Sequence, residues 1–131
     1  MNALPAILIC EHDALFLEAL RNLLLAAGYS RVDVVATVRE ALAKLRRERY
    51  SHILVGLSRP LLINRQRLAR VVQQRQPAAE VVFLVSAKDV PFITDTSADY
   101  VIKERAFSIL LDAIAPGANH EFANPTKRGS Q

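Results

Sequence analysis

The sequence predicts an α/β protein built on a doubly wound, five-stranded parallel sheet, and two observations lead to that prediction. Short apolar runs, typical of strands buried on both faces, alternate along the chain with longer segments whose apolar residues recur every three or four positions. The 131 residues, of which 51% are hydrophobic, also suffice for one domain with a buried core. Strands that alternate with helices pair in parallel and carry helices on both faces of the sheet.

The first predicted strand, Ile7–Cys10, is an apolar run that ends abruptly at a polar Glu-His-Asp cluster. The segment from Asp13 to Ala27 is predicted to be a helix, because apolar residues recur there at helical steps. Gly28 is expected to stop this helix, since glycine readily adopts the left-handed conformation common after helices. The residues expected on its inward side are Ala14, Leu17, Leu20, Leu24 and Ala27.

The second strand is predicted at Val32–Ala36, and the second helix runs from Thr37 to about Arg49. Thr37, with Glu40 three residues later, forms a capping-box pattern, in which each side chain bonds the backbone of the other position. The third strand, His52–Leu57, follows as another apolar run.

Pro60 closes the connection after the third strand, because proline cannot continue a strand ladder. Two helices and two strands are predicted beyond it, namely a helix at Asn64–Gln76, strands at Glu80–Ser86 and Asp99–Lys103, and a helix at Arg105–Ala115. The last helix is expected to turn four apolar residues inward, Phe107, Leu110, Leu111 and Ile114.

The charge of the chain is concentrated in its middle third. The whole chain carries 17 basic and 13 acidic residues, for a net charge of +4. The segment from Arg39 to Arg75 alone holds ten basic residues against two acidic ones, so the remainder is net negative. Such a segment is either a solvated basic face or a docking surface for an acidic partner.

Cysteine content and hydropathy bear on the compartment. One cysteine cannot form an internal disulfide, no basic segment followed by an apolar run opens the sequence, and no apolar run reaches the ~18 residues of a membrane span. We therefore expect a cytoplasmic protein that does not enter a membrane.

Three polar features follow three of the predicted strands. An acidic cluster, Glu11 to Asp13, follows the first strand, Ser86 follows the fourth, and Lys103 follows the fifth. In these features the chain resembles the response-regulator receiver domain (CheY-like) of two-component phosphorelay signalling in bacteria. The resemblance covers about residues 5–115 and implies the flavodoxin-like sheet order 2-1-3-4-5, with function at the carboxyl ends of the strands. It divides the chain into a receiver-like domain at 1–115 and a flexible tail at 116–131.

The resemblance also implies a pocket. Receivers accept a phosphoryl group on an aspartate that ends the third strand, with Mg²⁺ held by an acidic pair, a hydroxyl group on the phosphoryl oxygens and a lysine beside them. Carried over by position, the acidic pair falls on Glu11 and His12, with Asp13 beside them, and the acceptor falls on Gly56. The hydroxyl group is that of Ser86 and the lysine is Lys103. The aromatic residue that changes rotamer on activation in the family corresponds to Tyr100.

The acceptor position is the decisive departure from the family. The interval of 45 positions from Glu11 to Gly56 is that of the family, and no aspartate occurs between Asp33 and Asp89. Phosphoryl transfer needs an acceptor oxygen in line with the donor phosphorus, which glycine lacks. We expect no phosphorylation and no bound Mg²⁺ or other cofactor, since two carboxylate positions are lost. Lys103 is then expected to pair with Glu11 or Asp13.

A second departure concerns the fourth helix. Only 17 positions separate Ser86 from Lys103, roughly five fewer than in the family, or a turn and a half of helix. The helix that the family has between its fourth and fifth strands, its fourth helix, is therefore predicted to be shortened or missing here.

Several pocket residues have two readings. His12 is a solvated loop residue or else a ligand or pH sensor. Ser86 is vestigial, or it holds a free anion together with Lys103. Tyr100 is a plain strand residue with its hydroxyl group at the rim, or it is a switch.

The sequence contains no catalytic triad, P-loop, dinucleotide fingerprint or metal-spaced Cys/His cluster, so we expect no enzyme. We predict an atypical receiver domain, a pseudo-receiver, that binds a signalling or regulatory protein independently of phosphorylation; a homodimer stays open. The partner, acidic in the simplest case, would meet a basic face made of Arg39, Lys44, Arg46, Arg47, Arg65, Arg67 and Arg70. The alternatives are nucleic-acid binding by the Arg39 to Arg75 surface and an ordinary phosphorylated receiver, against which the absent aspartate counts.

Overall fold

The computed structural model describes residues 6–57, 62–92 and 99–114, without the side chains of residues 62–66, 92 and 113. The predicted tail at 116–131 and the side chain of Arg65 therefore lie outside the described residues.

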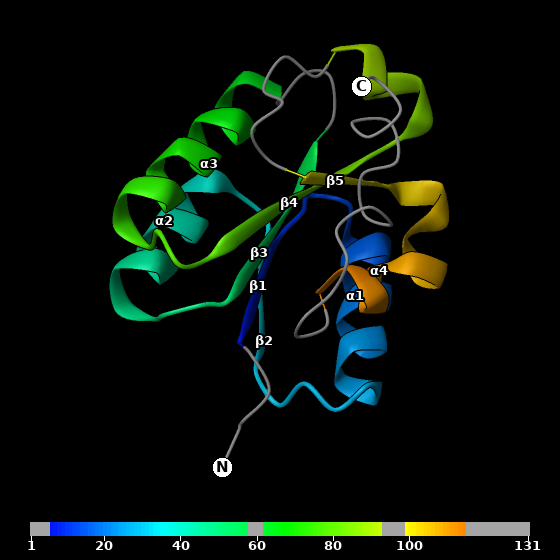
Figure 1. Ribbon diagram of the computed structural model, residues 1–131, viewed down its shortest axis with the longest axis horizontal. Coiled ribbons are helices and arrows are strands. Elements are labelled where there is room, and N and C mark those ends of the chain that lie inside the picture. Colours follow the sequence, from blue (N-terminus) through cyan, green and yellow to red (C-terminus); the bar gives the residue numbers. More distant parts are fainter. Residues whose placement is uncertain (1–5, 58–61, 93–98, 115–131) are drawn as a thin grey trace.

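The described residues form an α/β sandwich in three layers (Figure 1). The strands are β1 (Ile7–Cys10), β2 (Val32–Val35), β3 (His52–Leu57), β4 (Glu80–Val85) and β5 (Asp99–Ile102). The helices are α1 (Ala14–Ala26), α2 (Val38–Arg47), α3 (Leu62–Arg75) and α4 (Ala106–Ile114), with 3₁₀ segments η2 (Ala87–Phe92) and η3 (Lys103–Arg105). All strand pairs are parallel, in the order β2-β1-β3-β4-β5, which confirms the predicted fold class.

Local signals in the sequence set the ends of the first two helices. The Asp13 carboxylate accepts hydrogen bonds from the backbone N–H groups of Leu15 and Phe16 at the start of α1. Gly28 has φ of 106°, the left-handed conformation expected after a helix. Thr37 and Glu40 form the predicted capping box at the start of α2, which ends at Arg47, two residues before the predicted end.

The segment between β4 and β5 is short, as predicted. Its described residues form the six-residue 3₁₀ segment η2 rather than an amphipathic α-helix. Residues 93–98 lie outside the described residues.

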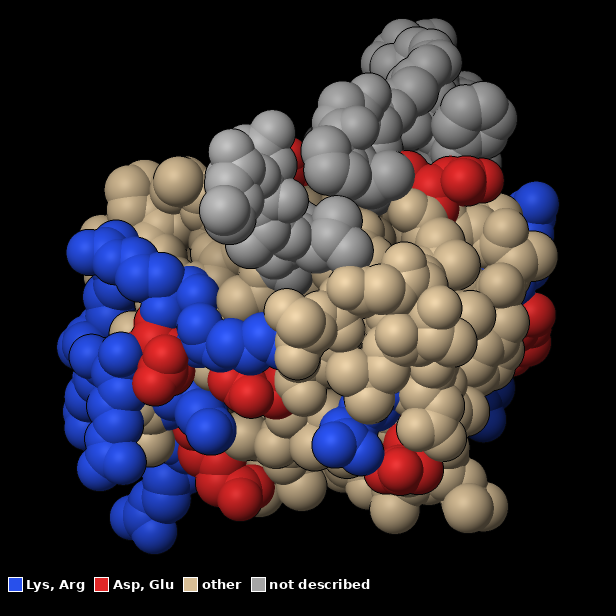
Figure 2. All heavy atoms as spheres, turned by 90° about the horizontal axis from the view of Figure 1, so that it is seen from below, with Lys and Arg blue, Asp and Glu red and all other residues tan. Residues whose placement is uncertain are grey.

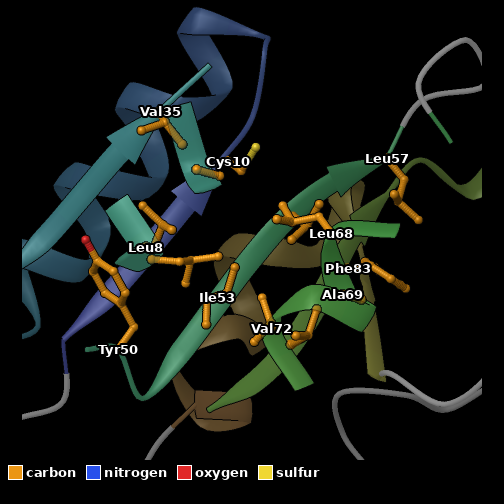
Figure 3. Packing of buried hydrophobic residues seen from close by; sticks show 14 of the residues in the cluster. Leu8, Cys10, Val35, Tyr50, Ile53, Leu57, Leu68, Ala69, Val72 and Phe83 are labelled. Carbon is orange, nitrogen blue, oxygen red and sulfur yellow. The ribbon is translucent and has the colours of Figure 1, made fainter. Parts of the chain in front are cut away.

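The core has two layers, one on each face of the sheet. Alternate strand residues point to opposite faces, so Leu8 packs with α2 and α3 while Ile7 packs with α1 and α4. Figure 3 shows the first layer, where Leu68, Ala69 and Val72 of α3 meet the sheet. The second and third helices thus share one face, as the right-handed crossovers require.

Three residues expected to face inward are exposed. Phe107 is 48% exposed, and Ala14 and Ala27 at the two ends of α1 are exposed as well. On α4 the buried positions recur at steps of four, at Ala106, Leu110 and Ile114. Phe107 therefore lies about 100° round the helix from this stripe and packs against a helix rather than the sheet.

Within the described residues, no helix combines the length and apolar character needed to cross a membrane.

Candidate functional site

The predicted pocket lies where β1, β3 and β5 end. β1 and β3 are neighbours, and their register pairs Cys10 with Val55. Glu11 and Gly56, the next residue of each strand path, therefore lie side by side. Lys103 directly follows β5 and reaches the same edge of the sheet.

Glu11 is fully buried at the centre of this pocket. Its Oε1 lies 2.9 Å from Nζ of Lys103, an ion-pair distance, although Oε1 accepts no aligned hydrogen bond. Its Oε2 accepts a hydrogen bond of 2.9 Å from the backbone N–H of Asp13, and Nδ1 of His12 lies 3.4 Å away. Lys103 therefore pairs with Glu11, one of the two partners that the sequence left open.

The absence of a side chain at Gly56 leaves the space that the Glu11 carboxylate occupies. A Cβ atom built on Gly56 would overlap Oε1 of Glu11 and lie 2.6 Å from its Cδ, far closer than atoms can approach. The Glu11 carboxylate therefore fills the space into which a side chain at position 56 would project. The carboxylate of Glu11, the residue after β1, thus occupies the place where an acceptor side chain at position 56 would begin.

Phe16 closes the pocket on the α1 side, a role that sequence analysis missed. Nζ of Lys103 lies 5.2 Å from the centre of the Phe16 ring, within the range of a cation–π contact. Phe107 of α4 meets the same ring edge-on, with the ring centres 5.9 Å apart. The Lys103 side chain is accordingly only 16% exposed. The exposed Phe107 thus supports the aromatic residue that covers the ion pair.

The residues present do not fit a magnesium site. Mg²⁺ prefers several hard oxygen ligands in octahedral geometry. Both oxygens of Glu11 are engaged by Lys103 and Asp13, and Gly56 supplies no side chain. The Asp13 carboxylate caps α1, while His12 is half exposed beside Glu11. Within the described ranges no three His, Cys, Asp or Glu side chains gather into a metal ligand set.

Of the remaining pocket positions, Ser86 directly follows β4 at the same edge of the sheet, whereas Tyr100 lies within β5. Ser86 is half buried, and the N–H of Ala87 donates to the Glu104 carboxylate at 3.1 Å. Tyr100 is buried, not at the rim as expected, and packs in the α2–α3 layer of the core. Its hydroxyl group has no hydrogen-bond partner among the described residues.

A second polar cluster secures β2 at the edge of the sheet. The hydroxyl group of Tyr50 donates a 2.6 Å hydrogen bond to Oδ2 of Asp33. Burial first, and this bond second, raise the pKa of Tyr50. Arg31 stacks over the Tyr50 ring at 5.0 Å and forms ion pairs with Asp33 and, at 2.9 Å, with Glu48.

The predicted basic face lies on the α2–α3 side of the molecule. Figure 2 shows lysine and arginine side chains gathered on one side of the end that carries the amino ends of the strands. Of the predicted residues, Lys44 is half buried and the others with described side chains are exposed, namely Arg39, Arg46, Arg47, Arg67 and Arg70. Two exposed arginines omitted from that face, Arg49 and Arg75, lie beside it at the ends of α2 and α3.

The sequence fails to match any protein-family model, and no curated protein matches it. Solved structures do match. A CheY-like receiver domain protein from Methanospirillum hungatei JF-1 has a TM-score of 0.72 at 23% identity, over 98% of this chain and 99% of its own.

Two further structures have the same fold. The receiver domain of an HD-domain-containing protein from Pseudomonas fluorescens Pf-5 has a TM-score of 0.69 at 19% identity, over 82% of this chain and 88% of its own. A Thermotoga maritima response regulator, solved with Mg²⁺ and beryllofluoride, has a TM-score of 0.67 at 22% identity, over 82% of this chain and 93% of its own. The chain therefore has the receiver-domain fold of two-component response regulators.

Proposed function

We propose that this chain is an atypical receiver domain, a pseudo-receiver, that binds a partner protein in two-component signalling without being phosphorylated. One observation carries the proposal. The Glu11 carboxylate, paired with Lys103, already occupies the space above Gly56 in which an acceptor side chain would begin.

The chemistry of the pocket supports this reading. Phosphoryl transfer needs an accessible in-line acceptor oxygen, and Glu11 is fully buried with both oxygens engaged. The ligand set is also unsuited to Mg²⁺, so we propose neither a metal cofactor nor an enzymatic activity. Because no phosphoryl group is added or removed beside the Glu11–Lys103 ion pair, the pocket does not switch the domain between two states.

A fixed domain acts through its surface. The proposed partner is a signalling or regulatory protein that recognises this one state. Nucleic-acid binding, the alternative from the sequence, is tested by gel shift with random duplex DNA. Binding of a second copy of the chain is tested by light scattering.

Phosphoryl-donor chemistry tests the proposal. We expect acetyl phosphate with Mg²⁺ to leave the intact mass unchanged and beryllofluoride with Mg²⁺ to leave the amide NMR spectrum unchanged. The Thermotoga maritima regulator, solved with Mg²⁺ and beryllofluoride, is the positive control for the reagent. A mass increase of one phosphate on this chain, or amide shifts around Glu11 and Lys103, would overturn it.

A further inference from the structure

Eight cations on the α2–α3 side of the molecule have no anionic partner among the described residues. In the part of the chain that the structure describes, none of them lies within ion-pair distance of a carboxylate. They are Arg39, Lys44, Arg46, Arg47, Arg49, Arg67, Arg70 and Arg75. Opposite charges on this face would lower its electrostatic free energy, so it is suited to an anionic partner.

Four of these arginines line a groove at the amino end of the sheet. The groove has a volume of about 330 Å³ and lies between the last turns of α2 and α3, with Arg46, Arg47, Arg49 and Arg75 on its walls. We call it the end groove.

A buried glutamine beneath the end groove links the end of α3 to the end of α2. The amide nitrogen of Gln76 donates to the carbonyl oxygens of Leu45 and Glu48, at 3.0 and 2.8 Å. Its amide oxygen accepts from the N–H of Tyr50 at 3.0 Å. The carbonyl groups of Leu45, in the last turn of α2, and of Glu48, its C-cap, are thereby satisfied inside the protein. Within the described residues the groove guanidinium groups have no carboxylate partner.

A second groove adjoins the first along the edge strand β2. This edge groove, of about 360 Å³, shares Arg47 and Glu48 with the end groove. Its apolar lining comes from the exposed Ala43 of α2 and from the half-buried Val34 of β2, while the neighbouring Val35 is buried in the core. Cationic Lys44 and Arg47 stand beside that apolar strip.

The two acidic residues that line the grooves already have partners. Glu48 forms an ion pair with Arg31, which does not line either groove. The Glu40 carboxylate accepts hydrogen bonds from the N–H groups of Ala36 and Thr37 in the capping box. Among the described residues, neither carboxylate lies within ion-pair distance of a groove arginine, and the four groove arginines outnumber the two carboxylates.

We propose that the end groove and the edge groove together bind an extended segment of a partner protein in which acidic and apolar side chains alternate. The acidic side chains would meet the groove arginines, and the apolar ones the strip formed by Ala43 and Val34. A nucleic acid fits less well, because its continuous phosphates would leave the apolar strip unused. This inference rests on the proposed function, whose interaction surface it names.

A synthetic peptide of alternating glutamate and leucine, acetylated and amidated, is the probe. We expect titration of the full chain to shift amide NMR signals of Val35, Ala43 and Lys44, around the grooves. Replacing leucine by serine should weaken binding, and part of the affinity should persist when salt screens exposed charges. Equal binding of both peptides, or no shifts at millimolar peptide, would overturn the inference.

Matched charge variants locate the site. Arg46→Gln/Arg47→Gln removes two groove cations and should weaken peptide binding about tenfold. Arg67→Gln/Arg70→Gln removes the same charge from α3 outside both grooves and should change it less than about twofold. Equal losses in the two variants would show general charge attraction and overturn the inference.

Binding of random duplex DNA is the third measurement, and it tests the nucleic-acid alternative. Tighter binding of DNA than of the glutamate–leucine peptide at physiological salt would replace this inference with nucleic-acid recognition. The outcome is distinguishable from failure of the proposed function, because acetyl phosphate tests the Glu11 pocket at the other end of the sheet. Peptide binding by a chain that also accepts a phosphoryl group would refute only the proposed function.

Discussion

The two ends of the sheet use charge in opposite ways. At the carboxyl end, Glu11 and Lys103 are buried, paired with each other and covered by Phe16. At the amino end, the arginines around the end groove are exposed and have no carboxylate partner in the described part of the chain, while the buried polar residue beneath them is the neutral Gln76.

This difference shows where charge contributes to stability and where it is left for binding. A buried charge must be paired, because an unpaired one costs several kcal/mol. Exposed cations are hydrated and change stability little, so they can be kept for a partner. We expect substitutions in the pocket to affect folding and substitutions of the groove arginines to affect binding, and five measurements test that contrast.

Removal of the pocket cation should have the largest effect. Lys103→Met leaves the buried Glu11 carboxylate without its cation and should lower the free energy of unfolding by about 3 kcal/mol, as measured by urea denaturation. Glu11→Gln/Lys103→Met, which removes both charges, should recover most of the loss. A cost below about 1 kcal/mol for the single variant would show that solvent reaches Glu11.

Loss of the buried glutamine should come next. Gln76→Leu leaves two carbonyl groups and one N–H group without partners and should cost about 2 kcal/mol in the same assay. Gln74→Leu, an exposed position of α3, is the matched control and should stay within about 0.5 kcal/mol. Similar effects at both positions would contradict the anchoring role of Gln76.

The space above Gly56 provides the third test. Gly56→Ala forces the Glu11 carboxylate to move and should cost roughly 1–2 kcal/mol. A Glu11→Ala background removes the three atoms nearest to the new methyl group, and the same change should cost less there. Equal costs in the two backgrounds, in a double-mutant cycle by urea denaturation, would show that the two residues do not compete for space.

The raised pKa of Tyr50 predicts a pH dependence at the edge of the sheet. The pKa of Tyr50 in the folded protein lies above the unfolded value of about 10. The stability that the protonated Tyr50 contributes is therefore present below about pH 10 and falls as pH rises beyond it. Tyr50→Phe should lose about 1 kcal/mol at neutral pH and show a shallower alkaline decline. Burial also raises the pKa of Tyr29, so some decline should remain. Thermal unfolding between pH 8 and about 11 measures the slope; an unchanged slope in Tyr50→Phe would rule Tyr50 out as its source.

The smallest effect on stability should come from the groove arginines. Arg46→Gln/Arg47→Gln should change the free energy of unfolding by less than about 0.5 kcal/mol, because both side chains are exposed and unpaired within the described residues. The peptide binding described above should nevertheless weaken. A loss of stability above about 1 kcal/mol would show that these residues hold the fold together instead.

Local sequence signals were sufficient for the elements and their order. The apolar runs, the Thr37–Glu40 capping box and Gly28 act within a few residues, so their effects can be predicted without the rest of the fold. Where a prediction needed the orientation of a side chain relative to the packed elements, it was less accurate. Phe107 lies one position from the buried stripe of α4, and the hydroxyl group of Tyr100 is buried.

The sequence by itself determined that position 56 has no side chain and that a lysine follows β5. It left open whether Glu11 or Asp13 pairs with that lysine, because both follow the same strand. Tertiary structure decided for Glu11, since the β1–β3 register places it beside Gly56, where a missing side chain leaves room for its carboxylate. The grooves likewise depend on how α2, α3 and the edge strand pack together, a long-range relation that no local pattern encodes.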